Sequence, residues 1–546
     1  MIMMVESFFG EITGEKEVKK EKKDITNMLK VKSKLFDIDA GSNIIIVHEY
    51  DAKDFDIFAE DRVEIYNQKT GESFIAIANM SDTLIKRGEI GLYNEVSNEI
   101  KPKKGDSYYI RPAEKPITVK YIKEKMEKGV LKDEQIFSII RDLMKNKLTK
   151  VELTAFIISA YINGLNMDET VALAKAIVES GDKLILDRHP VIDKHCIGGV
   201  AGNRTTMILV PVIAAAGLTI PKSSSRSITS PAGTADSMEV LAPVNLPLDE
   251  MKKIVLKTNG AIVWGGGLNL AAADDYLIHI RKPLKIDPRG MLLASIMAKK
   301  KAVGSEFVLI DIPVGAGAKV DTIEKAKELS NQFIELGGRL GMRIQTIITD
   351  GTAPIGRSIG PVLEAQDVLM LLENKSPSLD LRDKGCQMAG VLLESTGKAE
   401  PGMGAEMANN IIKNGKAIAK MREIIEAQGG DAKVKAEDLP VGQHRELIKS
   451  SVDSRIHGIE NKSVTEIAMA AGAPKCKGAG IKLFVEVGDK IRVGDPLYEI
   501  YAESEAKLDQ AIAVSEKINP VQYGKVILES YTGKRIFEIS KLNLEE

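Results

Sequence analysis

The chain has 546 residues, 44% of them hydrophobic and 28% charged, and at roughly 150 residues per domain this is enough for three or four domains with buried cores. Lysine and arginine number 75 against 77 acidic residues, a net charge of -2, so the basic excess of a nucleic-acid-binding protein is missing. Three widely spaced cysteines exclude a disulfide framework and argue against a zinc site, and the longest apolar run, 207–220, contains Pro211 and is shorter than the roughly 18 residues of a membrane helix. We therefore expect a cytoplasmic protein that acts on small molecules, binds no nucleic acid and does not span a membrane.

The N-terminal region changes character near residue 29. Within residues 1–28, the almost unbroken charged run Glu15–Asp24 has no apolar periodicity and cannot bury enough surface to offset its ordering entropy, so we expect a loose tail. From 29 to about 115, β-branched and alternating segments such as Asn43–His48 and Asp61–Tyr66 are separated by turn residues. This pattern predicts a small β-rich domain.

Residues 116–190 show helical spacing instead. Apolar residues recur on one face of 136–143, and Thr149 with Glu152 matches a capping box before a further apolar stripe. Gly164 stands where that helix should stop. We expect an all-helical domain, rejoined later in the chain by about residues 271–302.

From 191 to about 430, short β-type runs alternate with helical stretches and glycine-rich loops, which predicts an α/β domain with a mixed sheet. Its densest polar segment is Asp193–Thr206. Here the glycines allow close backbone approach, Lys194 adds a positive charge, and Thr205 adds a hydroxyl at a helix start. This is the chemistry of a phosphate-binding loop, although neither a Walker A nor a GxGxxG motif is present. A solvated glycine turn is the alternative interpretation.

A second loop, Ser223–Asp236, combines many hydroxyls with one arginine, Arg226, ahead of a helix that we expect to start near Asp236. Two anion-binding loops on one edge of a sheet indicate a phosphorylated substrate, free phosphate, or both. The alternative is a serine-rich loop that serves solubility.

A third polar region, 276–301, carries Arg281, Asp287, Ser295, Lys299 and Lys300 on a helical background. Ser295 and Lys299 are four residues apart and therefore share a helix face. Taken alone, these side chains are typical of surface charges, and they indicate a site only in combination with the two loops.

Residues 440–546 predict a compact α+β domain with short strands around the Gly488-Asp489 and Gly494-Asp495 turns. The pattern resembles biotinyl or lipoyl carrier domains, but no lysine sits in an attachment motif. We expect a structural role for this region.

The order of these motifs carries a family resemblance. Lys194-His195 with Gly198-Gly199, then Ser224–Asp236, then Arg281 with Ser295 and Lys299 resembles the thymidine and pyrimidine-nucleoside phosphorylases. The AMP phosphorylase branch, whose members carry an additional N-terminal β domain, is more similar, and the resemblance covers about residues 30–540. It implies that orthophosphate attacks C1′ of AMP, and also of CMP and UMP, and releases the free base and ribose 1,5-bisphosphate. It implies a homodimer or larger homo-oligomer. We expect no cofactor, and we expect no metal site because neither the cysteines nor the histidines have metal-ligand spacing.

The resemblance also assigns residues. The family's phosphate contacts match Lys194, Thr205, Ser224 and Thr234. Its nucleotide contacts match Gly199, Ser225, Arg226, Ser227, Ile228, Thr229, Ser230, Thr234, Ser295 and Lys319. Arg281 and Lys299 are candidate contacts to the base. Asp287 matches the proton donor, a role that requires burial of its carboxyl group.

The chain departs from the family at Cys196, where many relatives have a serine and where a thiol is a weaker hydrogen-bond donor. Two other functions remain open at this point: a pyrimidine-nucleoside phosphorylase, and a catalytically silent nucleotide-binding regulator that needs the loops but not Asp287 or Lys299. Because the loops belong to the α/β domain and the third region to the helical domain, we expect the active site in a cleft between them.

Overall fold

The computed structural model describes residues 24–103, 105–227, 230–376, 378–523, 529–532 and 535–538. The tail expected at 1–28 lies outside the described residues up to residue 23; the rest leads directly into the first strand, and Met28 is buried. The chain divides into two compact units, residues 1–182 with 271–298 and residues 183–270 with 299–546. None of the helices in the described segments is both long and apolar enough to cross a membrane.

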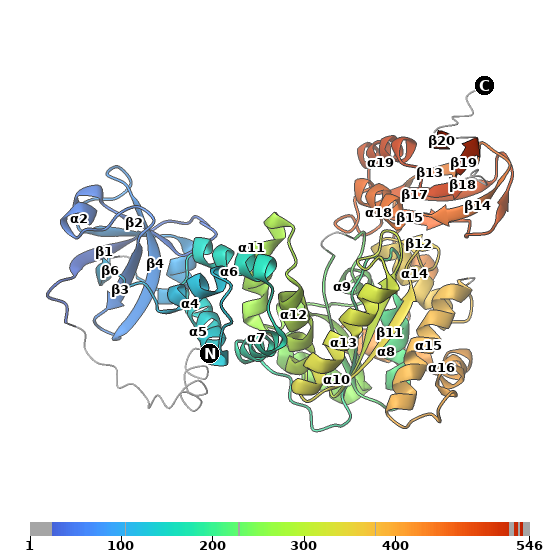
Figure 1. The fold of residues 1–546 in the computed structure, drawn as a ribbon, viewed down its shortest axis with the longest axis horizontal. Coiled ribbons are helices and arrows are strands. Elements are labelled where there is room, and N and C mark those ends of the chain that lie inside the picture. Colours follow the sequence, from blue (N-terminus) through green and yellow to red (C-terminus); the bar gives the residue numbers. More distant parts are fainter. Residues whose placement is uncertain are drawn as a thin grey trace. The chain divides into compact units, whose positions relative to one another are not determined.

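The N-terminal part of the first unit is a closed β-barrel with strand order β1-β5-β2-β4-β3-β6 (Figure 1). Its strands are β1 (Leu29–Leu35), β2 (Ile44–Val47), β3 (Arg62–Asn67), β4 (Glu72–Met80), β5 (Glu89–Leu92) and β6 (Ser107–Pro112). Helices α2 (Glu49–Asp54) and α3 (Asn94–Ile100) connect strands. Strand β1 closes the barrel by pairing with both β5 and β6. Inward-pointing side chains such as Val31, Ile45 and Tyr108 fill its core, and closure leaves no free sheet edge.

The remainder of the first unit is helical. It consists of α4 (Thr118–Met126), α5 (Asp133–Met144), α6 (Lys150–Asn163), α7 (Met167–Glu179), α11 (Ala272–Leu284) and the larger part of α12 (Arg289–Ala302). Helix α6 begins with the predicted capping box, in which Thr149 Oγ1 accepts a hydrogen bond from Glu152 N and Glu152 Oε2 accepts one from Thr149 N. It ends at Gly164, where φ is 71°. A buried ion pair of 2.7 Å between Lys125 and Glu169 joins α4 to α7.

The second unit has parallel strands at its centre. Strands β7 (Ile192–Cys196), β10 (Phe307–Val314) and β11 (Arg343–Asp350) form a sheet in the order β11-β10-β7, and β8 (Ile220–Ser224) pairs with β9 (Gly260–Trp264). All of these pairings are parallel, so the mixed sheet that we expected for this region is wrong. The physical reason is that the helix after each strand returns the chain to the strand's starting end.

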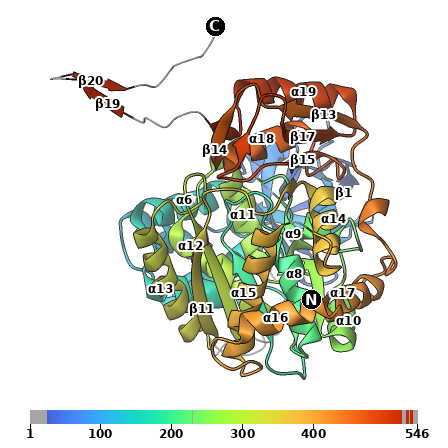
Figure 2. The ribbon, with the colours of Figure 1, turned by 90° about the vertical axis from the view of Figure 1, so that its right-hand side faces the viewer.

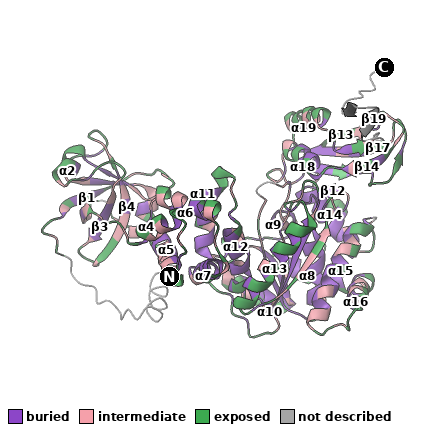
Figure 3. Ribbon diagram, in the orientation of Figure 1, coloured by how far each residue is buried: buried purple, intermediate pink, exposed green. Residues whose placement is uncertain are grey.

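Helices cover these strands. They are α8 (Thr205–Ala215), α9 (Thr234–Met238), α10 (Leu248–Thr258), α13 (Ile323–Arg339), α14 (Pro361–Leu372), α15 (Leu379–Ser395), α16 (Gly404–Lys413) and α17 (Lys416–Ala427), with the short turn η1 (Gly265–Gly267). Helices α13 and α15 lie on opposite sides of the sheet in both views (Figure 1 and Figure 2). Helix α8 is buried along almost its whole length (Figure 3).

Strand order brings the two predicted loops to one edge. Strands β7 and β8 run side by side, with a parallel bridge between Val191 and Thr219. Because parallel strands point the same way, the chain leaves both strands at the same edge, at Cys196 and Ser224. The glycine loop starts at the first point and the serine loop at the second.

The C-terminal part of the second unit contains two small sheets and the antiparallel strand pair β19–β20. Strands β12 (Ser358–Ile359), β15 (Gly480–Leu483), β17 (Pro496–Ala502) and β13 (His444–Lys449) form one, and β16 (Lys490–Ile491), β14 (Ser454–Ile459) and β18 (Val521–Tyr523) form the other. The remaining elements are η2 (Ala436–Asp438), α18 (Asn461–Ala470), α19 (Glu505–Lys517), β19 (Glu529–Thr532) and β20 (Arg535–Glu538). Strand β12 comes from the α/β region and pairs antiparallel with β15, so the two regions share a sheet.

Candidate active site

The first predicted loop joins β7 to α8. Lys194 on β7 is 1% exposed, and its Nζ lies 3.1 Å from Oγ1 of Thr205, the first residue of α8. The Thr205 hydroxyl donates to Asn203 Oδ1 at 2.8 Å and therefore accepts from the lysine. Gly198 and Gly199 between them have φ of 92° and 96°, a region that glycine adopts without strain. The structure thus brings together an ammonium group, a hydroxyl and a glycine-rich backbone at a helix start, which together can bind an anion.

Gly199 lies directly against a second predicted contact. A Cβ atom at Gly199 would stand 2.5 Å from the backbone N of Lys319 and 2.8 Å from Cα of Ala318. On the other side of the loop, Asn461 of α18 accepts a hydrogen bond from Ala201 N at 2.9 Å and donates to Gly351 O at 3.0 Å. The C-terminal part of the chain therefore holds the glycine loop in place.

The second predicted loop leaves Ser224 at the end of β8 and folds around Asp236. One carboxylate oxygen of Asp236 accepts hydrogen bonds from Ser227 N at 2.7 Å and Gly233 N at 2.9 Å. Helix α9 begins at Thr234, two residues earlier than expected, because Asp236 caps the helix from within its first turn.

The hydroxyls of this loop bond partly to one another. Ser227 Oγ and Ser230 Oγ lie 3.0 Å apart. The carbonyl oxygen of Ser225 packs against Gly233, where a Cβ atom would approach it to 2.6 Å. Ile228 and Thr229 lie outside the described residues. The described part of the loop is therefore tightly folded, with its ends held together by backbone contacts.

Arg226 has its own partners within the second unit. Its guanidinium donates to Glu239 and lies 3.4 Å from Asp236, and it stacks on the ring of Trp264 at 5.0 Å from the centroid. Lys477 from the C-terminal part also donates to Glu239, at 2.7 Å. The hydrogen bonds from Arg226, opposed by partial burial and supported by Lys477, lower the pKa of Glu239 to about 2. The Arg226 side chain thus stabilises the folded loop through its contacts with Glu239 and Trp264.

Several charged side chains are buried behind the glycine loop. Asp193 has no exposed surface; its carboxylate accepts a hydrogen bond from Lys300 Nζ at 2.6 Å and lies 3.5 Å from Lys222 Nζ. Burial, together with the positive charges of Lys300, Lys222 and Lys194, holds the pKa of His195 well below its usual range. His195 is therefore neutral at physiological pH.

Cys196 is a neutral thiol. Burial, with a further contribution from Asp311, raises its pKa to about 11. Its Sγ accepts a hydrogen bond from Asn203 Nδ2 at 3.2 Å. The thiol therefore faces the loop as a weak hydrogen-bonding group and carries no charge.

The third predicted group comes together around an aspartate of α11 in the first unit. Asp274, almost fully buried, accepts a hydrogen bond from Ser295 Oγ at 2.6 Å and lies 3.9 Å from Arg281 Nη2. Arg281 Nη1 lies 3.3 Å from Asp287. The Asp287 side chain is 46% exposed, so the burial that its proton-donor role requires is absent here. The boundary between the units falls after Ala298, so this group belongs to the first unit.

Lys299 follows that boundary and belongs to the second unit with both loops, whereas we expected it to group with Arg281 and Ser295. It lies on α12, one turn after Ser295. The structure therefore gathers the predicted residues into two sets, one in each unit. The loop residues and Lys319 form one set, and Arg281, Asp287 and Ser295 form the other.

A buried network in the second unit supports both loops. Arg204, at the end of the glycine loop, pairs with Asp367 and donates to Gly202 O at 2.8 Å. Glu364, on the same helix as Asp367, accepts from Ser237 Oγ of α9 at 3.0 Å. Burial raises the pKa of Glu364 to about 7. Helix α14 thereby contacts the segment that follows each loop.

Sequence reasoning placed Asp193 and Lys300 inside the polar segments without assigning them a role, and it missed Lys222, Trp264 and Asp274. One signal in the sequence could have found Lys222: it lies in the short strand Ile220–Ser224 directly after an apolar helix, and a lysine that is buried at such a place needs charged or polar partners. The others have no local signal, because their partners come from distant segments.

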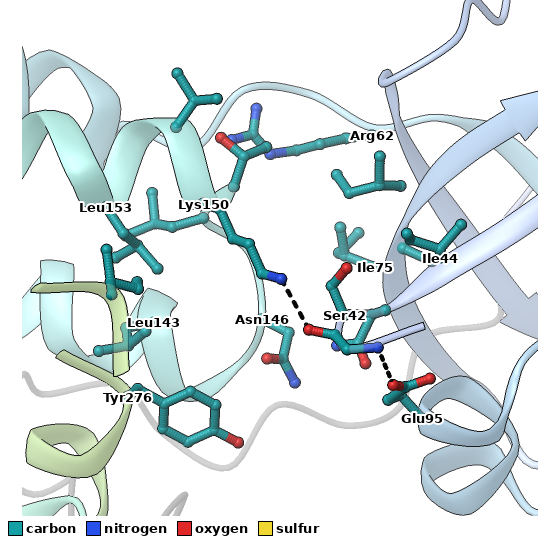
Figure 4. A pocket seen from close by; sticks show the side chains of 18 of the residues that line it. Ser42, Ile44, Arg62, Ile75, Glu95, Leu143, Asn146, Lys150, Leu153 and Tyr276 are labelled. Atoms are coloured by element: carbon teal, nitrogen blue, oxygen red, sulfur yellow. Dashed lines mark hydrogen bonds between the residues drawn. The ribbon is translucent and has the colours of Figure 1, made fainter. Parts of the chain in front are cut away.

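A separate cavity of about 990 Å³ lies within the first unit (Figure 4). Barrel residues such as Ser42 and Ile75 line one side, and helical residues such as Lys150 and Tyr276 line the other. Lys150 Nζ donates to the carbonyl oxygen of Gly41 at 2.8 Å across it. None of the predicted site residues lines this cavity.

Comparison with known proteins identifies three family regions. Residues 119–181 match the helical bundle domain of the glycosyl transferase family, residues 188–418 match its a/b domain, and residues 455–522 match the pyrimidine nucleoside phosphorylase C-terminal domain. An anthranilate phosphoribosyltransferase from Thermus thermophilus aligns with a TM-score of 0.48 and 19% identity, covering 56% of this chain and 98% of that chain.

Curated relatives match almost the whole chain. An AMP phosphorylase from Pyrococcus furiosus is 46% identical over 91% of this chain and 98% of its own length. The AMP phosphorylases of Thermococcus kodakarensis and Methanocaldococcus jannaschii are 46% and 45% identical, each over 92% of this chain and 99% of its own length. With this identity over nearly the full length, the chain belongs to the AMP phosphorylase family.

Proposed function

We propose that this protein is a phosphorylase that cleaves AMP, and also CMP and UMP, with orthophosphate. The ribose 5-phosphate moves from the base to orthophosphate, so the products are the free base and ribose 1,5-bisphosphate. The observation that carries the proposal is the buried ammonium group of Lys194, 3.1 Å from the Thr205 hydroxyl, on the sheet edge from which the serine loop also starts. Family membership supports it, because relatives of matching length are named AMP phosphorylases.

Orthophosphate would bind between the two loops. Lys194 supplies a charge, Thr205, Ser224 and Thr234 supply hydroxyls, and the start of α8 supplies a partial positive charge. A dianion held this way can approach C1′ of the ribose as the glycosidic bond breaks. Binding in a site poor in water strengthens each of these contacts.

The nucleotide would lie along the loop backbones. We assign it the contacts Gly199, Ser225, Arg226, Ser227, Ile228, Thr229, Ser230, Thr234, Ser295 and Lys319. For Arg226 we assign the backbone, because the guanidinium is engaged by Glu239 and Trp264. The close contact of Gly199 with Lys319 supports a shared role for those two residues.

Cleavage of the bond places negative charge on the departing base, and we assign Asp287 as the group that protonates it, with Arg281 and Lys299 as contacts to the base. Asp274 would orient both Arg281 and Ser295. Because Asp287 is 46% exposed, proton donation requires that substrate cover it. We therefore propose that turnover needs both sets of residues, the loop residues with Lys319 and the group around Asp274.

The decisive experiment is base release from AMP, CMP, UMP, adenosine and thymidine, each with and without phosphate. We expect release from the three monophosphates only, and only with phosphate, together with one ribose 1,5-bisphosphate per base. Release from thymidine but not AMP would identify a nucleoside phosphorylase instead. Binding of AMP without release of base from any substrate would identify a non-catalytic nucleotide-binding protein.

Three further properties belong to the proposal. We expect a cytoplasmic enzyme, in keeping with cysteines 196, 386 and 476, which are all free thiols. We expect a homodimer or larger homo-oligomer, which light scattering measures directly. We also propose that the domains are 29–115, 116–190 with 271–302, 191–430 and 440–546.

A further inference from the structure

Four charged side chains lie together behind the glycine loop, and the proposed chemistry uses only one of them. We call Asp193, Lys194, Lys222 and Lys300 the Asp193 cluster. One oxygen of Asp193 accepts from Lys300 Nζ at 2.6 Å, and the other lies 3.5 Å from Lys222 Nζ. The second oxygen also accepts from the backbone N of Lys194 at 2.7 Å. A single carboxylate thus joins Lys222 and Lys300 to the residue that would bind phosphate.

The charges of the Asp193 cluster do not balance. The three lysines are between 1% and 4% exposed, and Asp193 provides one negative charge for them. A further buried carboxylate, Asp311, lies 3.5 Å from Lys384 and also interacts with Lys194, so adding Asp311 and Lys384 to the count leaves its net charge unchanged. With all lysines protonated, two positive charges are buried without compensation, which is strongly unfavourable. A bound dianion would supply the two missing negative charges.

We propose that Lys222 is a positioning residue of the phosphate site and that it takes up a proton when a dianion binds there. Above pH 7 it is mostly a neutral amine in the empty site, and it becomes an ammonium ion in the occupied site. It acts through Asp193, because the Asp193 oxygen that lies next to Lys222 also accepts the hydrogen bond from Lys194 N. The inference rests on the proposed phosphate site and deepens it.

The surroundings of Lys222 support this assignment. Burial lowers its pKa to about 7; Lys300 and Lys194 act in the same direction, and Asp193 opposes them. His195 is already neutral in this range. Strand β9 and helix α8, which pack against β8, carry no titratable side chain. Helix α10 buries only Met251, Ile254, Val255 and Thr258.

Sulfate is a suitable probe, because it remains a dianion throughout the neutral range and any pH dependence of its binding therefore comes from the protein. We would titrate the full chain calorimetrically at pH 8 in buffers of different ionisation enthalpy, which counts the protons bound. With a pKa of about 7, we expect about 0.9 proton taken up per sulfate. The Kd should rise about fifteen-fold between pH 7 and pH 8.5.

Three variants assign the proton. Lys222→Met removes the titrating group, so proton uptake should vanish and the Kd should become independent of pH. Lys222→Arg keeps a permanent positive charge, so this variant should bind sulfate tightly at every pH. Thermal unfolding shows whether Lys222→Met folds, and if it does not, the arginine variant alone tests the inference. Lys257→Met is the matched control, because Lys257 is exposed on α10 of the same unit, and it should retain full uptake.

Glu364→Gln tests whether Glu364, a buried carboxyl group whose pKa is also about 7, takes up the proton instead. It should retain the proton uptake of the unmodified protein. Undiminished uptake in Lys222→Met, loss of uptake in Glu364→Gln, or no sulfate binding at all would each overturn the inference. Failure of the proposed function is separately visible, because it appears as a lack of base release from AMP, whereas sulfate binding is measured without nucleotide.

Discussion

Replacement of Gly199 by alanine tests whether the glycine loop and Lys319 form one nucleotide site. Gly199 has φ of 96°, and its missing Cβ would lie 2.5 Å from Lys319 N and 2.8 Å from Ala318 Cα. Ordinary contacts between such atoms begin at about 3.5 Å, so the backbone at 318–319 must move by roughly 1 Å. That movement carries Lys319 away from its position.

The loss of folding stability caused by Gly199→Ala has two parts. The left-handed backbone disfavours alanine by roughly 1–2 kcal/mol, and the overlap adds about 1–3 kcal/mol. Gly198→Ala is the matched control, because Gly198 has φ of 92° but its nearest neighbour would be the flexible Lys319 Cε at 3.8 Å. Gly198→Ala should therefore show the destabilisation from the left-handed backbone without that from steric overlap.

Urea unfolding and initial-rate kinetics measure both effects. We expect Gly199→Ala to be about 1–3 kcal/mol less stable than Gly198→Ala. A misplacement of 1 Å at a binding group costs up to about 100-fold, so kcat/KM for AMP should fall at least about tenfold below that of the control. Equal kcat/KM in the two variants would refute the role of this contact.

Three further predictions concern single side chains. Lys194→Met should raise the KM for phosphate by about 10- to 100-fold, because a charge-assisted hydrogen bond is lost, and it should change the KM for AMP by less than about threefold. An equal rise in both KM values would contradict a phosphate-binding role for Lys194. Asp287→Asn should lower kcat by about 100-fold or more with little change in AMP binding measured by calorimetry, and unchanged turnover would remove it as the donor. Glu364 has a pKa raised from 4.5 to about 7, so the native state binds the extra proton and the free energy of unfolding should fall by about 2–3 kcal/mol as pH rises from 4.5 to 7. Glu364→Gln should lack this fall in urea unfolding at pH 5 and pH 8, and the same fall in both proteins would show that another group is responsible.

Much of the local chemistry was predictable. The capping box at Thr149 and Glu152 is present, and the glycines before Thr205 adopt the left-handed backbone that close approach to an anion requires. The capping box and the glycine loop each depend on residues a few positions apart, so each can be recognised within one segment of the sequence. The serine loop is also folded at the expected place, although its helix begins at Thr234.

The partners of the charged residues were not predictable. Lys300 bonds to Asp193 across 107 residues, and Lys477 bonds to Glu239 across 238. These pairs exist because the last turn of α12 lies near β7 and because the C-terminal part lies on the α/β core. No periodicity or local motif encodes which of many exposed-looking lysines becomes buried beside which carboxylate.

By itself, the sequence singled out the two loops for which we propose anion binding, and it determined which family the chain resembles, because glycine, hydroxyl and lysine at fixed spacing act over a single loop. Only the tertiary structure decided that the core strands are parallel, that Arg226 is held by Glu239, that Asp274 gathers Arg281 and Ser295, and that three lysines share Asp193. The reason is physical: a charge buried by long-range packing takes its properties from whichever strands and helices become its neighbours.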